Sequence, residues 1–142
     1  MNLALLDPDH PQFPDPSTAL SEPDGLLAVG GNLDPSTLVD AYRQGIFPWY
    51  QDEDPILWWS PATRCLIEPK ALNISRRLRR LMRQQPYQIK TDSAFSKVMR
   101  ACAEPRGDGG TWITEDMMAS YTALHDQGQA HCVEVWDGSN LV

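Results

Sequence analysis

The sequence predicts an α/β fold, in which short strands alternate with amphipathic helices. Short apolar runs bounded by Gly, Pro, Asp or Ser predict the strands, and apolar residues at helical spacing between cap residues predict the helices. The chain has 142 residues, of which 42% are hydrophobic and 22% charged, so it can bury a core. This length suits one ordinary domain, or a small domain and part of a second one.

The first predicted elements are a strand and a helix. Residues 8–24 are rich in Pro, Asp and Ser and predict an irregular segment, and the apolar run 26–29 predicts a strand. Asp34 and Pro35 then supply an N-cap and a first-turn proline for a helix that ends at Gly45. The apolar residues on one face of this helix are Leu38, Ala41 and Tyr42.

Strands and helices continue to alternate through the middle of the chain. Residues 56–59 and 65–67 predict strands separated by a Ser-Pro turn, and residues 75–85 predict a helix. A strand at 87–90 and a helix at about 93–103 follow. The apolar stripe of the second of these helices is Phe95, Val98, Met99 and Cys102.

The last part of the chain predicts a loop, a helix and the start of a hairpin. Residues 106–110 are rich in Gly and predict a flexible loop, after which Thr114 caps a helix that ends near Gly128. The strand 132–136 is followed by an Asp-Gly turn and by the start of a returning strand at 140–142. The apolar face of the helix is expected in the core: Met117, Met118, Tyr121 and Leu124.

Charge is distributed unevenly along the chain, whose net charge is −7. Residues 1–63 carry ten acidic residues and one arginine, residues 64–106 carry eleven basic and three acidic residues, and residues 107–142 carry six acidic residues and no Lys or Arg. The change of sign predicts a domain boundary between residues 1–62 and 63–142. A basic block inside an acidic chain predicts local binding of a polyanion.

Cysteine, histidine and hydropathy patterns predict no metal site and no membrane segment. The cysteines are odd in number and too widely spaced for a zinc or disulfide framework, so ordinary buried thiols are expected: Cys65, Cys102 and Cys132. The three histidines show no ligand spacing either. Because an 18-residue apolar run and a secretory signal pattern are both lacking, we expect a cytoplasmic protein.

One predicted helix carries a concentrated basic face. Four arginines at positions i, i+3, i+4 and i+7 fall within an arc of about 100°: Arg76, Arg79, Arg80 and Arg83. The apolar residues on the opposite side are expected to anchor the helix on the protein: Ile74, Leu78, Leu81 and Met82. A helix face that serves solubility alone usually mixes charge signs, and this face has no acidic partner at i±4. Guanidinium groups bind phosphates in a bidentate manner, so the pattern predicts contacts to a nucleic-acid backbone.

Residues 45–61 contain three of the five tryptophans and three prolines. Trp58 and Trp59 alternate across a predicted strand and are expected to fill the core. Trp49 follows a proline in a loop, where its indole suits either a stacking surface for a base or the core. The residues alone leave the same two alternatives open for Trp112.

Four motifs together resemble the leucyl/phenylalanyl-tRNA–protein transferases, over nearly the whole chain. The motifs are EPDGLLAVGGNL (22–33), GIFPWYQDEDPILWWSP (45–61), TWIT (111–114) and AHCVEVW (130–136). The resemblance implies a bacterial cytoplasmic enzyme that moves Leu or Phe, and Met less well, from aminoacyl-tRNA to the N-terminal Lys or Arg of acceptor proteins. The product would enter N-degron degradation, and no cofactor is implied beyond the aminoacyl-tRNA donor.

The resemblance also implies a domain arrangement and site residues. It implies a small N-terminal α/β domain (1–62) and the first part of a GNAT-like, acetyltransferase-like domain (63–142), with the proposed catalytic relay beyond residue 142. It assigns Trp49 and Trp112 to the aminoacylated 3′-terminal adenosine. It assigns the basic face to the tRNA acceptor stem: Arg76, Arg79, Arg80 and Arg83. No catalytic acid or base is therefore expected within this chain, which we expect to be inactive alone.

Departures from the family pattern are mild, and two rival functions compete with the transferase. Asn32 is often Asp in the family, residues 62–63 replace a more Pro-rich turn, and Cys132 is often Ser. One rival is a non-catalytic module that binds the acceptor end of tRNA. The other is a generic acetyltransferase-like enzyme, which would need a Gly- and Arg-rich loop for the pyrophosphate of an acyl-CoA, and residues 106–110 are too short and acidic for it.

Overall fold

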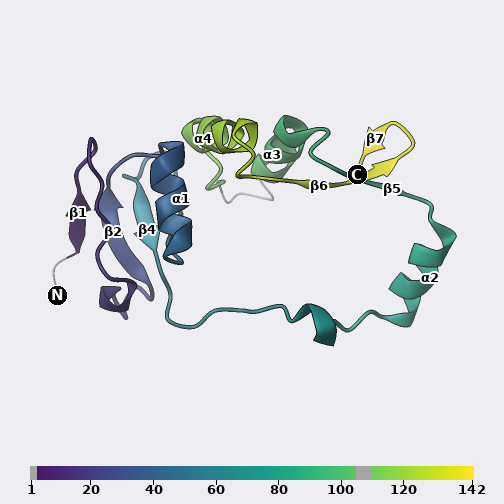
Figure 1. Ribbon diagram of the computed structural model, residues 1–142, viewed down its shortest axis with the longest axis horizontal. Helices are drawn as coiled ribbons and strands as arrows, with labels where there is room; N and C mark the ends of the chain where they lie inside the picture. The colour runs from purple at the N-terminus through teal and green to yellow at the C-terminus, as the bar shows by residue number, and fades with distance from the viewer. Residues whose placement is uncertain (1–2, 105–109) are drawn as a thin grey trace.

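The computed structural model describes residues 3–104 and 110–142 and has a mixed α/β fold with two sheets (Figure 1). The strand orders are β1-β2-β4-β3 and β5-β6-β7. The strands are β1 (Ala4–Leu6), β2 (Leu26–Gly30), β3 (Phe47–Pro48), β4 (Leu57–Trp59), β5 (Gln88–Thr91), β6 (Val133–Asp137) and β7 (Asn140–Leu141). The α-helices are α1 (Pro35–Arg43), α2 (Arg76–Gln84), α3 (Phe95–Ala103) and α4 (Glu115–Asp126), with short 3-10 helices at Pro16–Thr18 and Pro69–Ala71. The predicted α/β class is confirmed.

The first sheet is formed by the N-terminal part of the chain and shares its core with α1. β1 runs parallel to β2, and β4 runs antiparallel to both of its neighbours, with Ala28 opposite Trp58. Trp58 is fully buried, and its indole N–H donates to the carbonyl of Gly30 over 2.9 Å. Gly25 lies beside the end of β4, where an added Cβ would come within 2.5 Å of the Pro61 nitrogen. Only glycine therefore fits at this crossing of the backbone.

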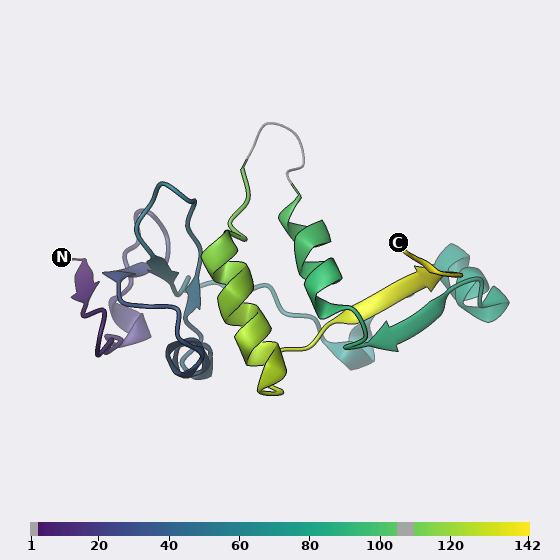
Figure 2. The ribbon, with the colours of Figure 1, turned by 90° about the horizontal axis from the view of Figure 1, so that it is seen from above.

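Helix α4 belongs to the same core, although α2, β5 and α3 lie between α1 and α4 in the sequence. Met117 and Leu124 of α4 are buried in one cluster with Leu38 and Ala41 of α1. Figure 2 shows α4 lying between the first sheet and α3. The predicted cap of α4 is confirmed, because the Thr114 hydroxyl accepts the Met117 N–H over 3.2 Å. The core of the first sheet thus draws on residues well beyond position 62.

The second sheet is antiparallel and is tied to α3 by a buried carboxylate. Ile89 of β5 lies opposite Val135 of β6, and β6 pairs with the returning strand β7 as the Asp-Gly turn predicts. Glu134 of β6 is 1% exposed and accepts the N–H groups of Ser93 and Ala94, each over 2.7 Å. These groups directly precede α3, whose N-cap residue Ala94 has no capping side chain of its own. Glu134 therefore caps α3 from a distant strand.

Helix α2 forms as predicted but is not anchored on the protein. Ser75 caps it by accepting the Leu78 N–H over 3.2 Å, and Gln85 ends it in the left-handed region. None of its residues is buried, and Leu78, Leu81 and Met82 are 47%, 38% and 56% exposed. The expectation of an anchored apolar face is therefore wrong for the structure described. Helical periodicity predicts that a face is apolar, but it does not specify the surface that covers that face.

Three further expectations fail or lie outside the described residues. Residues 65–67 form no strand, because no neighbouring strand pairs with them, and Leu66 is 86% exposed. Cys65 and Cys102 are exposed, so only Cys132 is the buried thiol that was expected. Of the predicted loop 106–110, all but Gly110 lies outside the described residues. No helix within 3–104 or 110–142 is long and apolar enough to cross a membrane.

Candidate functional site

An open pocket of about 380 Å³ lies where α1 ends and β3 begins. Trp49 and Trp112 both line this pocket, although 62 residues separate them in the chain. Their side chains are exposed, at 51% for Trp49 and 39% for Trp112. The structure therefore brings together the two tryptophans that sequence analysis singled out, and it leaves both rings accessible to a ligand. We call this the tryptophan pocket.

The turn after α1 fixes the backbone of Trp49. Gly45 has φ +73°, a left-handed conformation that ends α1 and sends the chain into β3. The N–H of Trp49 donates to the carbonyl of Leu57 over 3.0 Å, and the Trp49 carbonyl accepts the indole N–H of Trp59 over 2.7 Å. The two indole rings lie 5.8 Å apart at 60°. Both backbone polar groups of Trp49 are thus occupied, and its ring is left free for a ligand.

The residues after Trp112 anchor it at the start of α4. Ile113 and Thr114 are both buried, and the Ile113 N–H donates to the Thr111 hydroxyl over 3.1 Å. Because Thr114 also caps α4, whose Met117 lies in the core, the position of Trp112 depends on the packing of α4 against α1. Of the two alternatives left open for Trp112, a place in the core is not what the structure shows, because the side chain is exposed and lines the pocket.

The two tryptophans that were expected in the core, Trp58 and Trp59, differ in their burial. Trp58 is fully buried and packs edge-on against Phe13 with ring centroids 4.8 Å apart, as predicted. Trp59 is only partly buried, and its ring lies against Trp49. Trp59 therefore packs beside Trp49, a residue of the tryptophan pocket, while Trp58 is part of the core.

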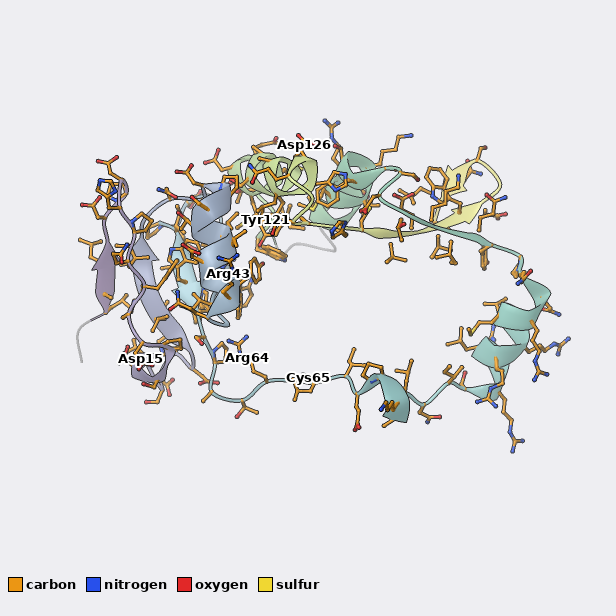
Figure 3. All side chains as sticks on the ribbon, viewed as in Figure 1. Asp15, Arg43, Arg64, Cys65, Tyr121 and Asp126 are labelled. Carbon is orange, nitrogen blue, oxygen red and sulfur yellow. The ribbon has the colours of Figure 1, made fainter. Side chains whose placement is uncertain are left out.

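Arg64 also lines the tryptophan pocket and was not singled out from the sequence. Its Nε–H donates to the Pro61 carbonyl over 3.0 Å, and its Nη2 donates to the Ser60 hydroxyl over 3.2 Å and to the Gly45 carbonyl. Its guanidinium carbon lies 5.3 Å from the Phe47 ring centroid. Figure 3 shows this side chain at the start of the long segment that leads to α2. The sequence feature that could have drawn attention to Arg64 is the change in the sign of the charge along the chain, which occurs at this residue.

The four predicted phosphate-binding arginines lie on α2 and not in the tryptophan pocket. All four are exposed, and the ion pairs found within residues 3–104 and 110–142 involve none of them. Figures 1 and 2 both show α2 at the far end of the molecule from the first sheet. The four arginines form a positive face of α2 that has no local neutralisation: Arg76, Arg79, Arg80 and Arg83.

A second open pocket, of about 590 Å³, lies between α1, α3 and α4 beside a histidine and carboxylate pair. The Nδ1 of His131 lies 2.7 Å from the Oδ2 of Asp92, and the Cys132 N–H donates to the other oxygen over 2.9 Å. The bond from Cys132, assisted by His131, lowers the pKa of Asp92. The phenols of Tyr42 and Tyr121 are hydrogen-bonded at this pocket, and burial raises the pKa of Tyr121.

These groups offer binding chemistry rather than a complete catalytic set. The tryptophan pocket combines two accessible π-faces with one guanidinium, which suits a base or nucleoside that carries an anionic group. Burial and the neighbouring Glu134 carboxylate raise the pKa of the Cys132 thiol, which disfavours a thiolate nucleophile there. Within the part of the chain that the structure describes, no cluster of His, Cys, Asp and Glu has the arrangement of a metal site.

Comparison with known families gives two adjacent matches. Residues 66–142 match the family described as leucyl/phenylalanyl-tRNA protein transferase. Residues 31–62 match the N-terminal domain of the same family. The two matches together contain Trp49, Trp112 and the whole of α2.

Curated relatives bear the same name. A leucyl/phenylalanyl-tRNA–protein transferase of Cellvibrio japonicus is 54% identical over 138 residues, which cover 96% of this chain and 59% of the relative. Proteins of that name from Nitrosomonas europaea and Photobacterium profundum are 57% and 51% identical, covering 87% and 99% of this chain. These matches cover 53% and 59% of the two relatives, so the chain spans less than two thirds of the length of each.

Proposed function

The chain belongs to the leucyl/phenylalanyl-tRNA–protein transferase family, and from this premise we propose that it provides the donor-binding part of an aminoacyl transfer. The donor is an aminoacyl-tRNA carrying Leu or Phe, with Met as a weaker third. The acceptor is the N-terminal Lys or Arg of a protein, which the added residue marks for N-degron degradation in the cytoplasm. The chain needs no cofactor for this beyond the donor itself.

The observation that carries the proposal is the meeting of Trp49 and Trp112 in one pocket with both rings exposed. Burying indole rings is favourable, so exposed tryptophans that share a pocket indicate a ligand surface. Stacking of a base on an aromatic ring contributes about 1–3 kcal/mol and tolerates any sequence in the rest of the nucleic acid. A terminal adenosine common to every tRNA fits such a surface. We therefore place the aminoacylated 3′-terminal adenosine between these two residues.

The arginine face of α2 is proposed to bind the tRNA acceptor stem. Its guanidinium groups are exposed and unneutralised by local ion pairs among the described residues, which favours phosphate oxygens as partners. Phosphate contacts carry no sequence information, so one face can serve donors that differ in their tRNA bodies. The residues of this face are Arg76, Arg79, Arg80 and Arg83.

The reaction proposed is ester aminolysis. The α-amine of the acceptor attacks the aminoacyl carbonyl, and the 3′-terminal ribose hydroxyl leaves with a proton. This step needs an unprotonated amine, a proton relay to the leaving oxygen and a fixed mutual orientation of the two substrates. The tryptophan pocket supplies orientation of the donor, whereas we assign no acid or base within residues 1–142. We therefore propose that a polypeptide of these residues binds the donor without transferring its amino acid.

Substitution of Trp49 tests the proposal. Titration with a 3′-aminoacyl-adenosine analogue, followed by tryptophan fluorescence, should show an affinity loss of about 5- to 150-fold in Trp49→Ala, which corresponds to one stacked base. Trp49→Phe should retain part of the affinity, because stacking requires a π-face more than an indole. Tyr87→Ala, which removes an exposed aromatic ring outside the pocket, is the matched control. Equal affinities of the unchanged chain and Trp49→Ala would refute the assignment.

A second candidate function is a non-catalytic module that holds the acceptor end of tRNA. It is favoured by one observation: among the described residues that line the tryptophan pocket, none is assigned as a catalytic acid or base. The two candidates differ in transfer of labelled Leu from Leu-tRNA to a protein with N-terminal Arg. The protein to be tested has the full length of the family members and contains these residues. Transfer of Leu by this protein supports the enzyme, and binding of tRNA without transfer supports the module.

A further inference from the structure

We propose that Arg64 binds the phosphate on the 5′ side of the terminal adenosine, so that the tryptophan pocket recognises a nucleotide rather than a nucleoside. The inference rests on the proposed function, because it takes the adenosine to lie between Trp49 and Trp112. It adds a second kind of contact to the same pocket, since stacking alone gives no preference for a charged ligand.

The guanidinium of Arg64 is preorganised to bind an anion, because hydrogen bonds within the protein already fix its orientation. Three oxygens fix its Nε and Nη2 groups: the carbonyls of Pro61 and Gly45 and the hydroxyl of Ser60. All three partners are neutral, so they orient the guanidinium without cancelling its charge. The Nη1 group takes part in none of the hydrogen bonds found among residues 3–104 and 110–142, so its two N–H donors are available to a ligand.

A fixed guanidinium loses little conformational entropy when it binds an anion. An ordinary surface arginine must be ordered on binding, and that ordering offsets part of the energy gained from the new hydrogen bonds. Arg64 is already ordered by its three hydrogen bonds and by the Phe47 ring, 5.3 Å away. Its contribution to ligand affinity should therefore be large for an exposed arginine.

The size and lining of the pocket favour a phosphate beside a single nucleoside. Its volume of about 380 Å³ lies near the lower end of the range of roughly 300–1,000 Å³ for small-molecule sites, and its remaining lining is largely apolar. Arg64 is the one cationic side chain among the residues that line it. Arg64 is the first residue of the basic block 64–106 and follows residues 1–63, whose net charge is −9. A single cation at the edge of an aromatic pocket matches a single phosphodiester next to a stacked base.

The test compares two ligands that differ only in a 5′-phosphate. The probes are a 3′-aminoacyl-adenosine analogue and its 5′-phosphorylated form, titrated into the full chain at constant ionic strength. We expect the phosphate to raise the affinity of the unchanged chain about 10- to 100-fold, the range of hydrogen bonds to a charged group. Arg64→Gln should abolish this gain, so that the affinities for the two ligands differ by no more than about twofold in this variant. Arg64→Lys should keep part of the gain, because it retains the charge but not the planar fork.

Arg43→Gln is the matched control, because Arg43 is an exposed arginine near the end of α1 that does not line the tryptophan pocket. It should keep the full phosphate gain. Two results would overturn the inference while leaving the adenosine site intact: no phosphate gain in the unchanged chain, or equal weakening of both ligands by Arg64→Gln. The second result would make Arg64 a support for the turn at Gly45. Failure of both ligands to bind the unchanged chain would contradict the proposed function itself and the inference with it.

Discussion

Glu134 has a pKa well below that of a free glutamate side chain. Burial disfavours its charged form, but hydrogen bonds from Ser93, Trp136 and Ala94 favour it. The hydrogen bonds outweigh burial and lower the pKa of Glu134 from 4.5 to about 2. The carboxylate is therefore charged at neutral pH, where it holds the start of α3 against β6.

This pKa predicts how stability depends on pH. A carboxyl group with a depressed pKa in the folded state contributes stability that is fully present above its unfolded pKa and is lost as pH falls through the folded pKa. For Glu134 the loss should occur between pH 4.5 and about pH 2. Glu134→Gln should therefore unfold at a lower urea concentration than the unchanged chain at pH 7, and the difference should shrink as pH falls through this window.

Glu53→Gln is the control for this experiment, because Glu53 is exposed in the loop before β4. It should show little change at either end of the range. The role assigned to Glu134 fails if Glu134→Gln unfolds at the same urea concentration as the unchanged chain at pH 7.

Sequence reasoning reached some of these residues and not others. Trp49 was found because an indole beside prolines is conspicuous, and Trp112 was found through the resemblance to a known family; the structure gives them a common pocket. Their role in binding adenosine stays a prediction. Arg64 and Glu134 were missed because both act through hydrogen bonds to residues that are distant in sequence. Arg64 donates to the carbonyl of Gly45, and Glu134 accepts the N–H of Ser93. Such contacts leave no periodic pattern in the sequence.

At the scale of elements, helices were easier to predict than strands. Thr114 and Gly128 marked the ends of α4 correctly, because caps and left-handed glycines act locally. The predicted strand at 65–67 is absent because a strand requires a partner, and an apolar run does not show whether one is present. The two-residue strand β3 was not predicted for the same reason, since its pairing with β4 defines it.

The packing of α4 against α1 connects the stability of the core to the tryptophan pocket. Met117 is fully buried in the shared cluster, and Trp112 lies just before the cap of the same helix. Met117→Ala should lower the free energy of unfolding by about 2–5 kcal/mol, because it removes buried apolar surface and leaves a cavity. Urea denaturation measures this change. Met82→Ala, at a methionine that is 56% exposed on α2, should stay within about 0.5 kcal/mol.

A destabilisation by Met117→Ala no larger than that of Met82→Ala would contradict the shared core. It would mean that α4 is held by other contacts, and that Trp112 does not depend on the α1 and α4 interface. A loss of stability together with weaker binding of the adenosine analogue would instead connect the core to the pocket.

At the scale of the whole molecule, the change of charge sign falls between the strands of the first sheet and helix α2. The acidic residues 1–63 form the first sheet and α1, and the basic residues 64–106 include the exposed helix α2. The tryptophan pocket is lined mainly by residues of the first of these parts, with Arg64 and Trp112 added from beyond it, and the arginine face lies on α2 in the second. The boundary between residues 62 and 63 stays a prediction, and α4 adds core residues to the first sheet from beyond it. A tRNA whose end is bound in the pocket and whose stem contacts α2 would join the two parts.

The most direct test of this account is the affinity of Leu-tRNA for four proteins, measured over a range of salt concentrations. They are the unchanged chain, Trp49→Ala, the triple variant Arg76→Ala, Arg80→Ala and Arg83→Ala, and the combination of both changes. Trp49→Ala should weaken binding about 5- to 150-fold without altering the log–log salt slope, because stacking releases no counterions. The triple variant should flatten the slope by about two units, since each lost phosphate contact removes about 0.7 to 0.9.

If one tRNA occupies both surfaces, the combination should lose the sum of the two free energies, because the changes are far apart and share no partner. An affinity unchanged by Trp49→Ala, together with a salt slope unchanged by the triple variant, would place the tRNA elsewhere on the molecule and contradict the account.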